Sequence, residues 1–221
     1  MRTRLRPIGN AVVNDTSDAV AAGLPARRKG RERRQQIVDA AKEVLLTQGI
    51  TGLVLRDIAV QLGITHGNLQ YYFPTKEDLL VAIFDQELLS YTDSLHSAAK
   101  QTSSRQGRIA AILDSGFSQV KTKSSTLWRM LMSFAEQRPQ LAEILKQQNL
   151  RFDSEVASEL ALIVPEVSEM RRKHIAQAFR MMLDGFAVQL IWEEPTSPEI
   201  IALESELKVM LTAWILAPED R

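Results

Sequence analysis

A short segment that follows a sharp turn at residues 63–65 has the residue types best suited to a chemical role. At 100° per residue, a helix over 66–73 turns two large apolar side chains, Leu69 and Phe73, towards the protein core. Its other sides carry no acidic residue and present His66, Gly67, Asn68, Gln70, Tyr71 and Tyr72. Asn and Gln amides pair with the adenine edge in the major groove, which is about 12 Å wide and admits a helix. The segment therefore has the pattern of a helix that reads DNA bases, and A·T pairs are the expected targets.

The sequence contains no comparable set of residues for catalysis or metal binding. The chain has no cysteine, and its 3 histidines, at positions 66, 96 and 174, have no second histidine at helical spacing. The sequence also lacks the HExxH, GxSxG, P-loop and GxGxxG motifs. We therefore expect no catalytic residue, no metal site and no cofactor.

Two helices are predicted before this segment. An apolar stripe at i, i+4, i+7 and i+8 from Ile37 predicts a first helix that begins at Arg31 and ends at Gly49. A second, shorter helix is predicted over 55–62. It ends at Gly63, which can adopt the left-handed conformation that a tight turn needs.

The segment itself and the helix after it have their own start signals. Thr65 is a predicted N-cap of the third helix, and Pro74 ends that helix. Thr75 caps a fourth helix, in which Asp78 can complete a capping box. Short helices joined by a sharp turn are typical of a helix-turn-helix unit.

The remainder of the chain has the pattern of long amphipathic helices separated by brief breaks. No strand-length alternation of apolar and polar residues bounded by turns occurs. We predict helices over roughly 76–101, 105–121, 124–137, 139–163, 165–193 and 198–216. The expected fold is all-α, with a three-helix helix-turn-helix DNA-binding domain over 31–78 and a larger helical ligand-sensing and dimerisation domain over 79–221.

Basic residues are concentrated near the N-terminus. The whole chain has 27 basic and 27 acidic residues, yet residues 1–78 hold 12 basic and 8 acidic ones. Residues 1–30 show no sustained periodicity, contain two prolines and three glycines, and are predicted to form a flexible basic arm, in which residues 18–22 could form a short transient helix. A run of cations at its end is either solvated or contacts the DNA backbone or minor groove: Arg27, Arg28, Lys29, Arg31, Arg33 and Arg34.

No part of the 221-residue sequence predicts export or membrane insertion. The content of 45% hydrophobic and 24% charged residues is typical of a globular protein with a sizeable core. No apolar run approaches the roughly 18 residues of a membrane span, and no apolar signal core follows the N-terminal arginines. We expect a cytoplasmic protein without a membrane partner.

The segment from Gly49 to Leu80, GITGLVLRDIAVQLGITHGNLQYYFPTKEDLL, resembles the DNA-binding domain of the tetracycline-repressor (TetR) family. The shared elements are the glycine that ends the first helix, Arg56 to Ala59, Leu62 to Thr65, Gly67, Leu69, Tyr72, Phe73, Lys76 and Leu79. The resemblance covers about residues 31–85 by motif, and the rest of the chain matches only in length and helical character. It implies a homodimeric DNA-binding regulator whose C-terminal part senses a small ligand.

The resemblance also implies roles for individual residues. Positions that contact phosphates in the family correspond here to Thr65, Tyr72 and Lys76. Arg56 corresponds to a position that can reach a base edge from the second helix. The variable base-reading positions correspond to His66, Asn68, Gln70 and Tyr71. Gly67 would let the backbone approach the DNA closely.

The sequence departs from the family pattern at two positions, and three of the proposed DNA-contacting residues could have other roles. Val54 occupies a position where the family commonly has a capping threonine, and Gln70 one where it often has tyrosine. Tyr72 fits a core aromatic as well as a phosphate contact. Arg56 could instead pair with a nearby acid, and His66 could be a surface histidine without any contact.

The C-terminal two-thirds of the chain carries apolar and aromatic stripes, and each stripe could have either of two roles. Those of the last two helices could form a four-helix bundle with a second subunit or be buried within one chain: Ile175, Phe179, Met182, Phe186, Leu190, Ile200, Leu203, Leu207, Met210, Leu211 and Trp214. The middle helices supply either plain core or a ligand pocket, for which the candidates are Trp128, Arg129, Met132, Phe134, Glu136 and Phe152. Arg129 and Glu136, seven residues apart, share a face and could bind a polar ligand or each other.

These features predict a homodimeric, ligand-responsive transcriptional regulator, most simply a repressor. It would bind a palindromic double-stranded DNA operator through the helix over 66–73 and respond to an unknown small-molecule effector, with dimerisation through the last two helices. Two other classes remain open, a DNA-bound structural or cell-division factor without a ligand switch and an all-α small-molecule enzyme. Operator affinity that no metabolite changes would favour the first, and turnover of a metabolite without DNA retention the second.

Overall fold

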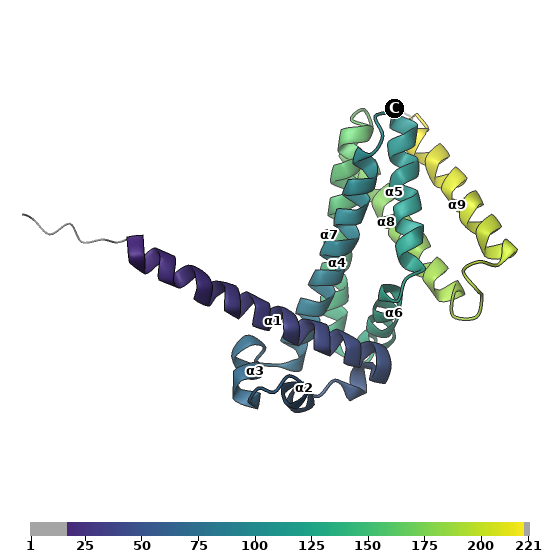
Figure 1. Cartoon of the computed structure of the whole chain (residues 1–221). Coiled ribbons are helices and arrows are strands. Elements are labelled where there is room, and N and C mark those ends of the chain that lie inside the picture. Colours follow the sequence, from purple (N-terminus) through teal and green to yellow (C-terminus); the bar gives the residue numbers. More distant parts are fainter. Residues whose placement is uncertain (1–16, 219–221) are drawn as a thin grey trace, which may run out of the picture.

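Nine α-helices and no strand make up residues 17–218, the part of the chain whose backbone is described by a computed structural model; side chains are described for residues 28–218 (Figure 1). The helices are α1 (Ser17–Gly52), α2 (Leu55–Gln61), α3 (His66–Tyr72), α4 (Lys76–Lys100), α5 (Arg105–Val120), α6 (Ser124–Ala135), α7 (Pro139–Ile163), α8 (Glu169–Gln189) and α9 (Pro198–Leu216). The predicted all-α fold is confirmed for this range.

Helix α1 begins earlier than the sequence pattern predicts. It starts at Ser17 instead of Arg31, and its first half projects away from the other helices (Figure 1). Residues 17–30 are therefore helical where irregular chain was expected, the flexibility of the arm stays a prediction, and residues 1–16 lie outside the described part. Gly23 and Pro25 suggested irregular chain, but Ala26, Lys29 and the arginines that follow them favour a helix.

Glycines end the first helix and form the turn between the next two, as predicted. Gly49 and Gly63 have φ values of 70° and 63°, in the left-handed region that favours glycine. Helical assignment continues past Gly49 to Gly52, but the backbone at Gly49 itself is not helical. The turn at residues 63–65 therefore separates α2 from α3 and sets the direction of α3.

The long helices follow their predicted bounds closely, with α8 as the main exception. The prediction was 165–193, whereas α8 spans Glu169–Gln189. It begins late because the Ser168 side chain caps it, accepting the Arg171 N–H at 3.3 Å. It ends early because the N–H groups of Ile191 and Trp192 bond three residues back and form a tighter turn.

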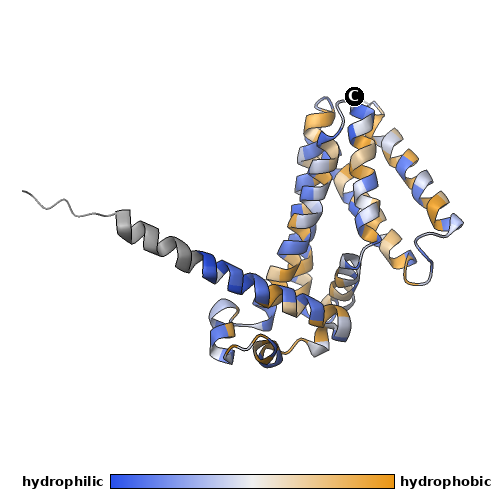
Figure 2. Cartoon of the chain, viewed as in Figure 1, coloured by the Kyte–Doolittle hydropathy of each residue, from blue (hydrophilic) through white to orange (hydrophobic). Residues whose placement is uncertain are grey.

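Two clusters of buried hydrophobic side chains hold these helices together, and Figure 2 shows the hydrophobic residues along them. One cluster joins α1–α3 to the start of α4, to α6 and to the start of α7 through residues such as Leu69, Leu79 and Leu131. The other joins the rest of α4 to α5, α7, α8 and α9 around Phe117 and Phe179. Because α4 contributes to both clusters, the domain boundary after residue 78 stays a prediction.

A histidine links α4 to α7. His96 Nδ1 lies 2.7 Å from Glu159 Oε2, and His96 Nε2 lies 3.3 Å from Glu155 Oε2. The buried Glu159 also accepts a hydrogen bond from Arg108 at 2.8 Å. Burial lowers the pKa of His96, but hydrogen bonds and charge attraction from the two glutamates outweigh burial and raise the pKa above its usual 6.5.

This contact makes the stability of the fold depend on pH. Since the pKa of His96 is raised on folding, its charged form contributes stability that is fully present below pH 6.5 and is lost as the pH rises through the folded-state pKa. We therefore expect the loss of Tm caused by His96→Gln to be larger at about pH 6 than at about pH 8.5. A loss of the same size at both pH values, measured by thermal unfolding, would contradict a charged His96 in this contact.

Candidate nucleic-acid interface and internal cavity

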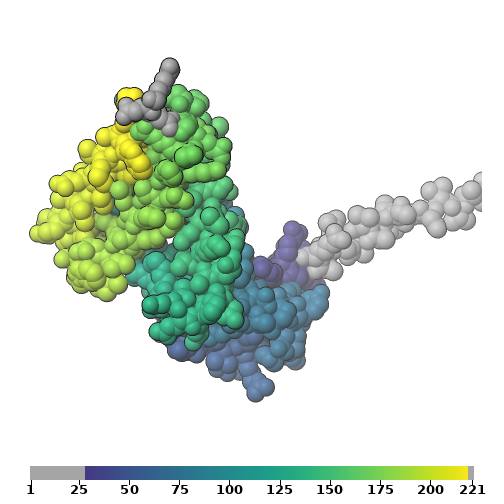
Figure 3. Space-filling view, turned by 180° about the vertical axis from the view of Figure 1, so that it is seen from behind, coloured from purple at the N-terminus to yellow at the C-terminus, as the bar shows by residue number. Residues whose placement is uncertain are grey.

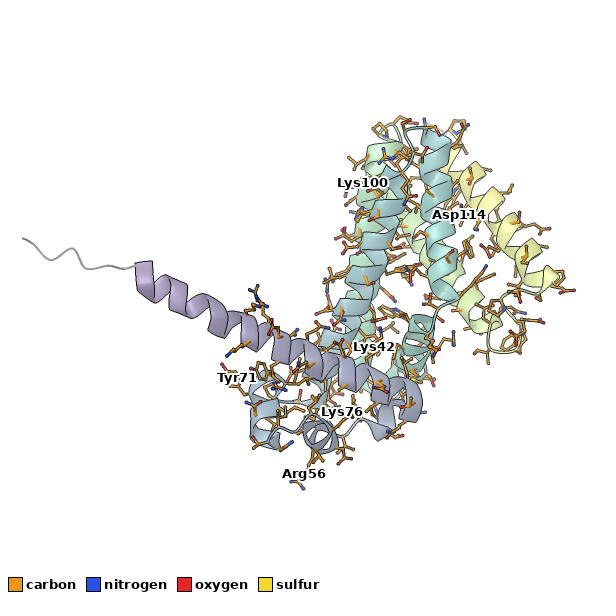
Figure 4. All side chains as sticks on the ribbon, viewed as in Figure 1. Lys42, Arg56, Tyr71, Lys76, Lys100 and Asp114 are labelled. Carbon is orange, nitrogen blue, oxygen red and sulfur yellow. The ribbon has the colours of Figure 1, made fainter. Side chains whose placement is uncertain are left out.

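Helix α3 turns one side to the core and the other to solvent. Leu69 is fully buried, and Phe73, directly after the helix, is 2% exposed. Tyr71 is 81% exposed, and Asn68 and Gln70 are exposed as well. Figure 4 shows Tyr71 at the outer edge of the three N-terminal helices. This orientation is the predicted one, and it leaves the three polar side chains outside the core.

Side-chain caps fix the starts of both α3 and α4, as predicted. Thr65 Oγ1 accepts the Asn68 N–H at 3.1 Å. Thr75 Oγ1 accepts the Asp78 N–H at 3.0 Å, and Asp78 Oδ2 accepts the Thr75 N–H at 3.0 Å. The capping role of Thr65 is therefore confirmed, and its phosphate contact stays a prediction.

Tyr72 takes part in the packing between α3 and α1. It is half-buried, and its ring lies edge-on to that of Tyr71 with centroids 5.1 Å apart. Its hydroxyl is 3.9 Å from the position that a Cβ atom on Gly30 would take. A packing role for the ring is thus established, and a phosphate contact by the hydroxyl is an additional prediction.

His66 and Gly67 open the helix at its exposed end. His66 is half-buried, and its Nδ1 atom is buried without a hydrogen-bond partner in the described part of the chain. A Cβ atom on Gly67 would meet no other atom of the chain within 4 Å. Nothing within the described residues therefore requires glycine at position 67, which is compatible with the predicted close approach of DNA.

Arg56 lies on the exposed side of α2, and Figure 4 shows it reaching away from the body at the end that carries α2 and α3. No acidic side chain among the described residues forms an ion pair with it. Its alternative role as half of a surface ion pair therefore has no support. Val54 precedes α2 without a side-chain capping bond, as its residue type predicts.

The basic residues of α1 are divided between internal contacts and open surface. The Arg34 guanidinium lies 4.9 Å from the centre of the Phe73 ring, and Arg28 pairs with Glu32 at 2.8 Å. The other described cations of this run form no ion pair with described residues: Lys29, Arg31 and Arg33. The side chain of Arg27 lies outside the described part, and a DNA contact by the run stays a prediction.

A cavity of about 90 Å³, partly open to solvent, lies among α4, α5, α6, α7 and α8. Three of the predicted ligand residues line it, namely Trp128, Met132 and Phe152. Tyr91 of α4 adds a third aromatic ring, which stacks on Phe152 with centroids 5.3 Å apart. The structure therefore brings half of the predicted ligand set together around one space.

The other three predicted ligand residues lie outside this cavity. Arg129 donates to Ser125 Oγ at 2.9 Å and to the Ala187 carbonyl at 3.3 Å, so it links α6 to α8, and its role towards a ligand stays a prediction. The Phe134 ring packs under the Arg138 guanidinium at 5.4 Å, and Glu136 is exposed. Arg129 and Glu136 do not pair with each other in the structure. A spacing of seven places two residues on one face but does not fix which neighbouring helix that face meets.

Comparison with known proteins agrees with the geometry of α1–α4. Residues 37–83 match the sequence profile of the bacterial regulatory proteins of the tetR family. The fatty acid metabolism regulator protein of Bacillus subtilis is 27% identical over 123 residues, which cover 54% of this chain and 63% of that protein. The HTH-type transcriptional regulator BetI of Brucella canis is 26% identical over 175 residues, covering 77% of this chain and 87% of that protein.

The DNA-binding domain of the chain belongs to the TetR family. The chain is accordingly a DNA-binding transcriptional regulator with a helix-turn-helix domain. Its fold extends the likeness beyond that domain. The multidrug binding protein EbrR, solved in complex with imidazole, superposes with a TM-score of 0.61 at 22% identity, covering 86% of this chain and 98% of that one.

Lys76, a predicted phosphate contact of this TetR-family domain, has an internal partner. Its ammonium group donates a hydrogen bond to the Ile50 carbonyl, beyond the glycine that ends the regular part of α1. Burial lowers the pKa of Lys76, and the positive charge of Arg138 lowers it further. Lys76 therefore joins α1 to the first turn of α4, and a phosphate oxygen would have to share or replace the Ile50 carbonyl.

Replacing Lys76 tests its role on DNA. We expect Lys76→Ala to weaken specific and non-specific DNA binding alike and to reduce the slope of log K against log[salt] by about one unit. Lys100→Ala, which removes an exposed lysine at the far end of the same helix (Figure 4), is the control and should leave the slope unchanged. An unaltered slope in Lys76→Ala would assign Lys76 to the internal bond alone.

Sequence reasoning missed several polar residues of the cavity. Glu87, Gln148, Arg180 and Asp184 line it, yet they are distributed over α4, α7 and α8. Each occurs in an amphipathic pattern in which a charged residue is normally assigned to the solvent face. The only available signal was an acidic or amide residue within an apolar stripe, and that signal is weak.

No helix in the described part of this TetR-family chain is long and apolar enough to cross a membrane.

Proposed function

We propose that this TetR-family protein is a homodimeric repressor that a small molecule releases from a palindromic operator. The observation that supports DNA reading is the outward side of α3, where Asn68, Gln70 and Tyr71 are exposed while Leu69 and Phe73 hold the helix to the core. Arg56, Thr65, His66, Gly67, Tyr72 and Lys76 complete the proposed DNA contacts. A protein that acts on chromosomal DNA in a bacterium would lie in the cytoplasm.

Helices α8 and α9 are the proposed dimer interface. They form the side of the molecule away from α1–α3 (Figure 3). Ile175, Phe179 and Phe186 are buried within the chain, whereas Leu203, Met210 and Trp214 are 39%, 49% and 37% exposed. Because α9 carries large apolar side chains on its outer side as well as its inner side, it supports packing against a second copy in a four-helix bundle.

Helix α4 connects the proposed effector cavity to the DNA-binding domain. It begins at Lys76, and its middle contributes Glu87, Leu88 and Tyr91 to the cavity wall. Glu87 is 7% exposed and forms an ion pair with Lys42 of α1. A ligand that moves α4 or competes for Glu87 would therefore shift α1–α3.

Such a shift would act through the separation of the two recognition helices. In a dimer they must lie about 34–36 Å apart to enter successive major grooves. Inverting a 99:1 preference for the DNA-bound form requires the ligand to favour the released form by about 5.5 kcal/mol. Trp128, Met132 and Phe152 are the predicted ligand residues that fit this role.

The proposed function is tested by footprinting on DNA fragments that the purified protein selects from a random pool. Two protected half-sites related by two-fold symmetry are expected, and at least one compound of a metabolite panel should abolish the protection. Protection of a single unpaired half-site would overturn the dimer. Protection that no metabolite changes would instead favour a DNA-bound structural factor without a ligand switch.

A further inference from the structure

One residue of the cavity wall has a hydrogen-bond acceptor that no described residue satisfies. Gln148 is 3% exposed, and its Oε1 atom is buried without a hydrogen-bond partner in the described part of the structure. Its Nε2 atom donates to Asp85 Oδ1 at 2.6 Å, which fixes the orientation of the amide because a flipped amide would place two oxygens together. Gln148 therefore offers an acceptor that calls for an N–H or O–H donor from outside the chain.

The ion pairs around the cavity leave one carboxylate without a cation of its own. Four carboxylates lie in or next to its wall, those of Asp85, Glu87, Asp153 and Asp184, and three cations pair with them, those of Lys42, Arg151 and Arg180. Arg129 also lies beside the wall, where it bonds Ser125 and the Ala187 carbonyl, but it pairs with no described carboxylate, so cations and carboxylates near the cavity are equal in number. Arg180 is shared, since its Nε lies 2.9 Å from Asp153 Oδ1 and its Nη1 lies 3.4 Å from Asp184 Oδ2. Burial raises the pKa of Asp184, although the Arg180 charge opposes this rise. Asp184 is thus the carboxylate with the weakest compensation.

Aromatic rings form the remaining wall. Tyr91, Trp128 and Phe152 all line the cavity, and such rings attract a cation that lies over their faces. The Tyr91 hydroxyl donates to the Gly116 carbonyl at 3.2 Å, so its proton is already used within the chain. The aromatic wall therefore adds cation affinity without adding a free donor.

We propose that this cavity binds a small organic cation that carries at least one N–H or O–H donor. The proposal rests on the proposed function, in which the cavity is the effector site. A cation supplies a partner for Asp184, which shares Arg180 with Asp153, a donor for Gln148 Oε1 and a partner for the aromatic rings. A neutral ligand would leave Asp184 with only its share of Arg180, and an anion would place a further negative charge beside Glu87 and Asp184.

The carboxylate of Glu87 connects the cavity to the DNA-binding domain. Glu87 lines the cavity and holds Lys42 of α1, a residue that Figure 4 shows near the crossing of α1 and α4. A bound cation competes with Lys42 for this carboxylate. Cation binding therefore weakens a contact that fixes α1 against α4.

Three molecules of nearly the same shape test the charge requirement: benzamidinium, benzamide and benzoate. Each is titrated into the full-length protein by isothermal calorimetry. We expect benzamidinium to bind at least tenfold more tightly than benzamide, and benzoate not to bind. Equal binding of benzamide and benzamidinium, or no binding of benzamidinium, would overturn the proposal.

Two cavity variants and one control assign the effect to residues. Asp184→Asn should weaken benzamidinium at least tenfold and change benzamide little, and Gln148→Met should weaken benzamidinium while leaving the fold intact by circular dichroism. Glu206→Gln, an exposed carboxylate-to-amide change on α9, should change neither. Unaltered benzamidinium affinity in both cavity variants would place the cation elsewhere and overturn the proposal.

Measuring operator affinity with a ligand bound distinguishes a failure of the cation proposal from a failure of the proposed ligand response. A bound cation that leaves operator affinity unchanged would uphold the cation site and reject the ligand response. Operator release by a neutral or anionic metabolite that occupies the cavity would uphold the ligand response and reject the cation.

Discussion

The double substitution Leu203→Glu, Met210→Glu is expected to produce a folded monomer that binds the operator about 10²–10⁴-fold more weakly. The two residues are seven apart on α9 and lie on one outward stripe, where they are 39% and 49% exposed. Placing four glutamates in a symmetric interface would cost desolvation and charge repulsion in the dimer, whereas in the monomer they remain in water. Operator affinity falls because a monomer binds one half-site with a single DNA-binding domain, whereas in the dimer the second DNA-binding domain is held close to the other half-site.

Sedimentation and operator titration on the same preparations measure this result. Leu162→Glu is the control, because it places the same acid at a 69% exposed apolar position on α7, outside α8 and α9. It should stay dimeric and bind normally. A double variant that remains dimeric would show that the outer stripe of α9 is not the interface.

The substitution Phe179→Ala is expected to lower the free energy of unfolding by about 3–5 kcal/mol. Phe179 is 2% exposed, and its ring centre lies 6.3 Å from that of Phe117 on α5 and 6.3 Å from that of Phe152 on α7. A Cβ atom on Gly116 would come within 2.4 Å of the Phe179 ring, so the ring fills a space that glycine leaves open. Its removal would create a cavity where three helices meet, and would loosen Phe152 at the proposed effector cavity.

Urea unfolding compares this variant with Leu150→Ala, an apolar truncation at a 51% exposed position of α7. The control should change stability by no more than about 0.5 kcal/mol. If both variants lose the same amount, the aromatic cluster does not carry the stability of the C-terminal helices. The loss expected for Phe179 is a large share of a typical total of about 5–15 kcal/mol.

The DNA-binding end was predictable from sequence because local chemistry sets its structure. Thr65 and Thr75 cap helices with bonds that span three residues, and Gly49 and Gly63 supply backbone angles that other residues rarely adopt. The sides of α3 follow from helical periodicity alone. These signals lie within a few residues of the features they determine, so no tertiary information was needed.

The cavity was predictable only in part because distant helices build it. Trp128, Met132 and Phe152 were found as Met and aromatic positions, while the charges of Glu87 and Asp184 come from two other helices. The link that Arg129 makes between α6 and α8 was not predicted, because its partners, Ser125 and the Ala187 carbonyl, depend on how the two helices meet. The start of α1 was missed for a different reason, since Gly23 and Pro25 outweighed the helix-forming residues around them.

The most direct test of base reading by α3 is the affinity of wild type and Asn68→Ala for the selected operator and for every single base-pair variant of it. The Asn68 side chain is exposed and its N–H is held by Thr65, so alanine removes the amide without disturbing the cap. We predict a loss of about 1–3 kcal/mol that is confined to one base pair in each half-site, at which the variant no longer discriminates. A uniform loss at all positions, or none, would contradict the reading of DNA bases by the outward side of α3.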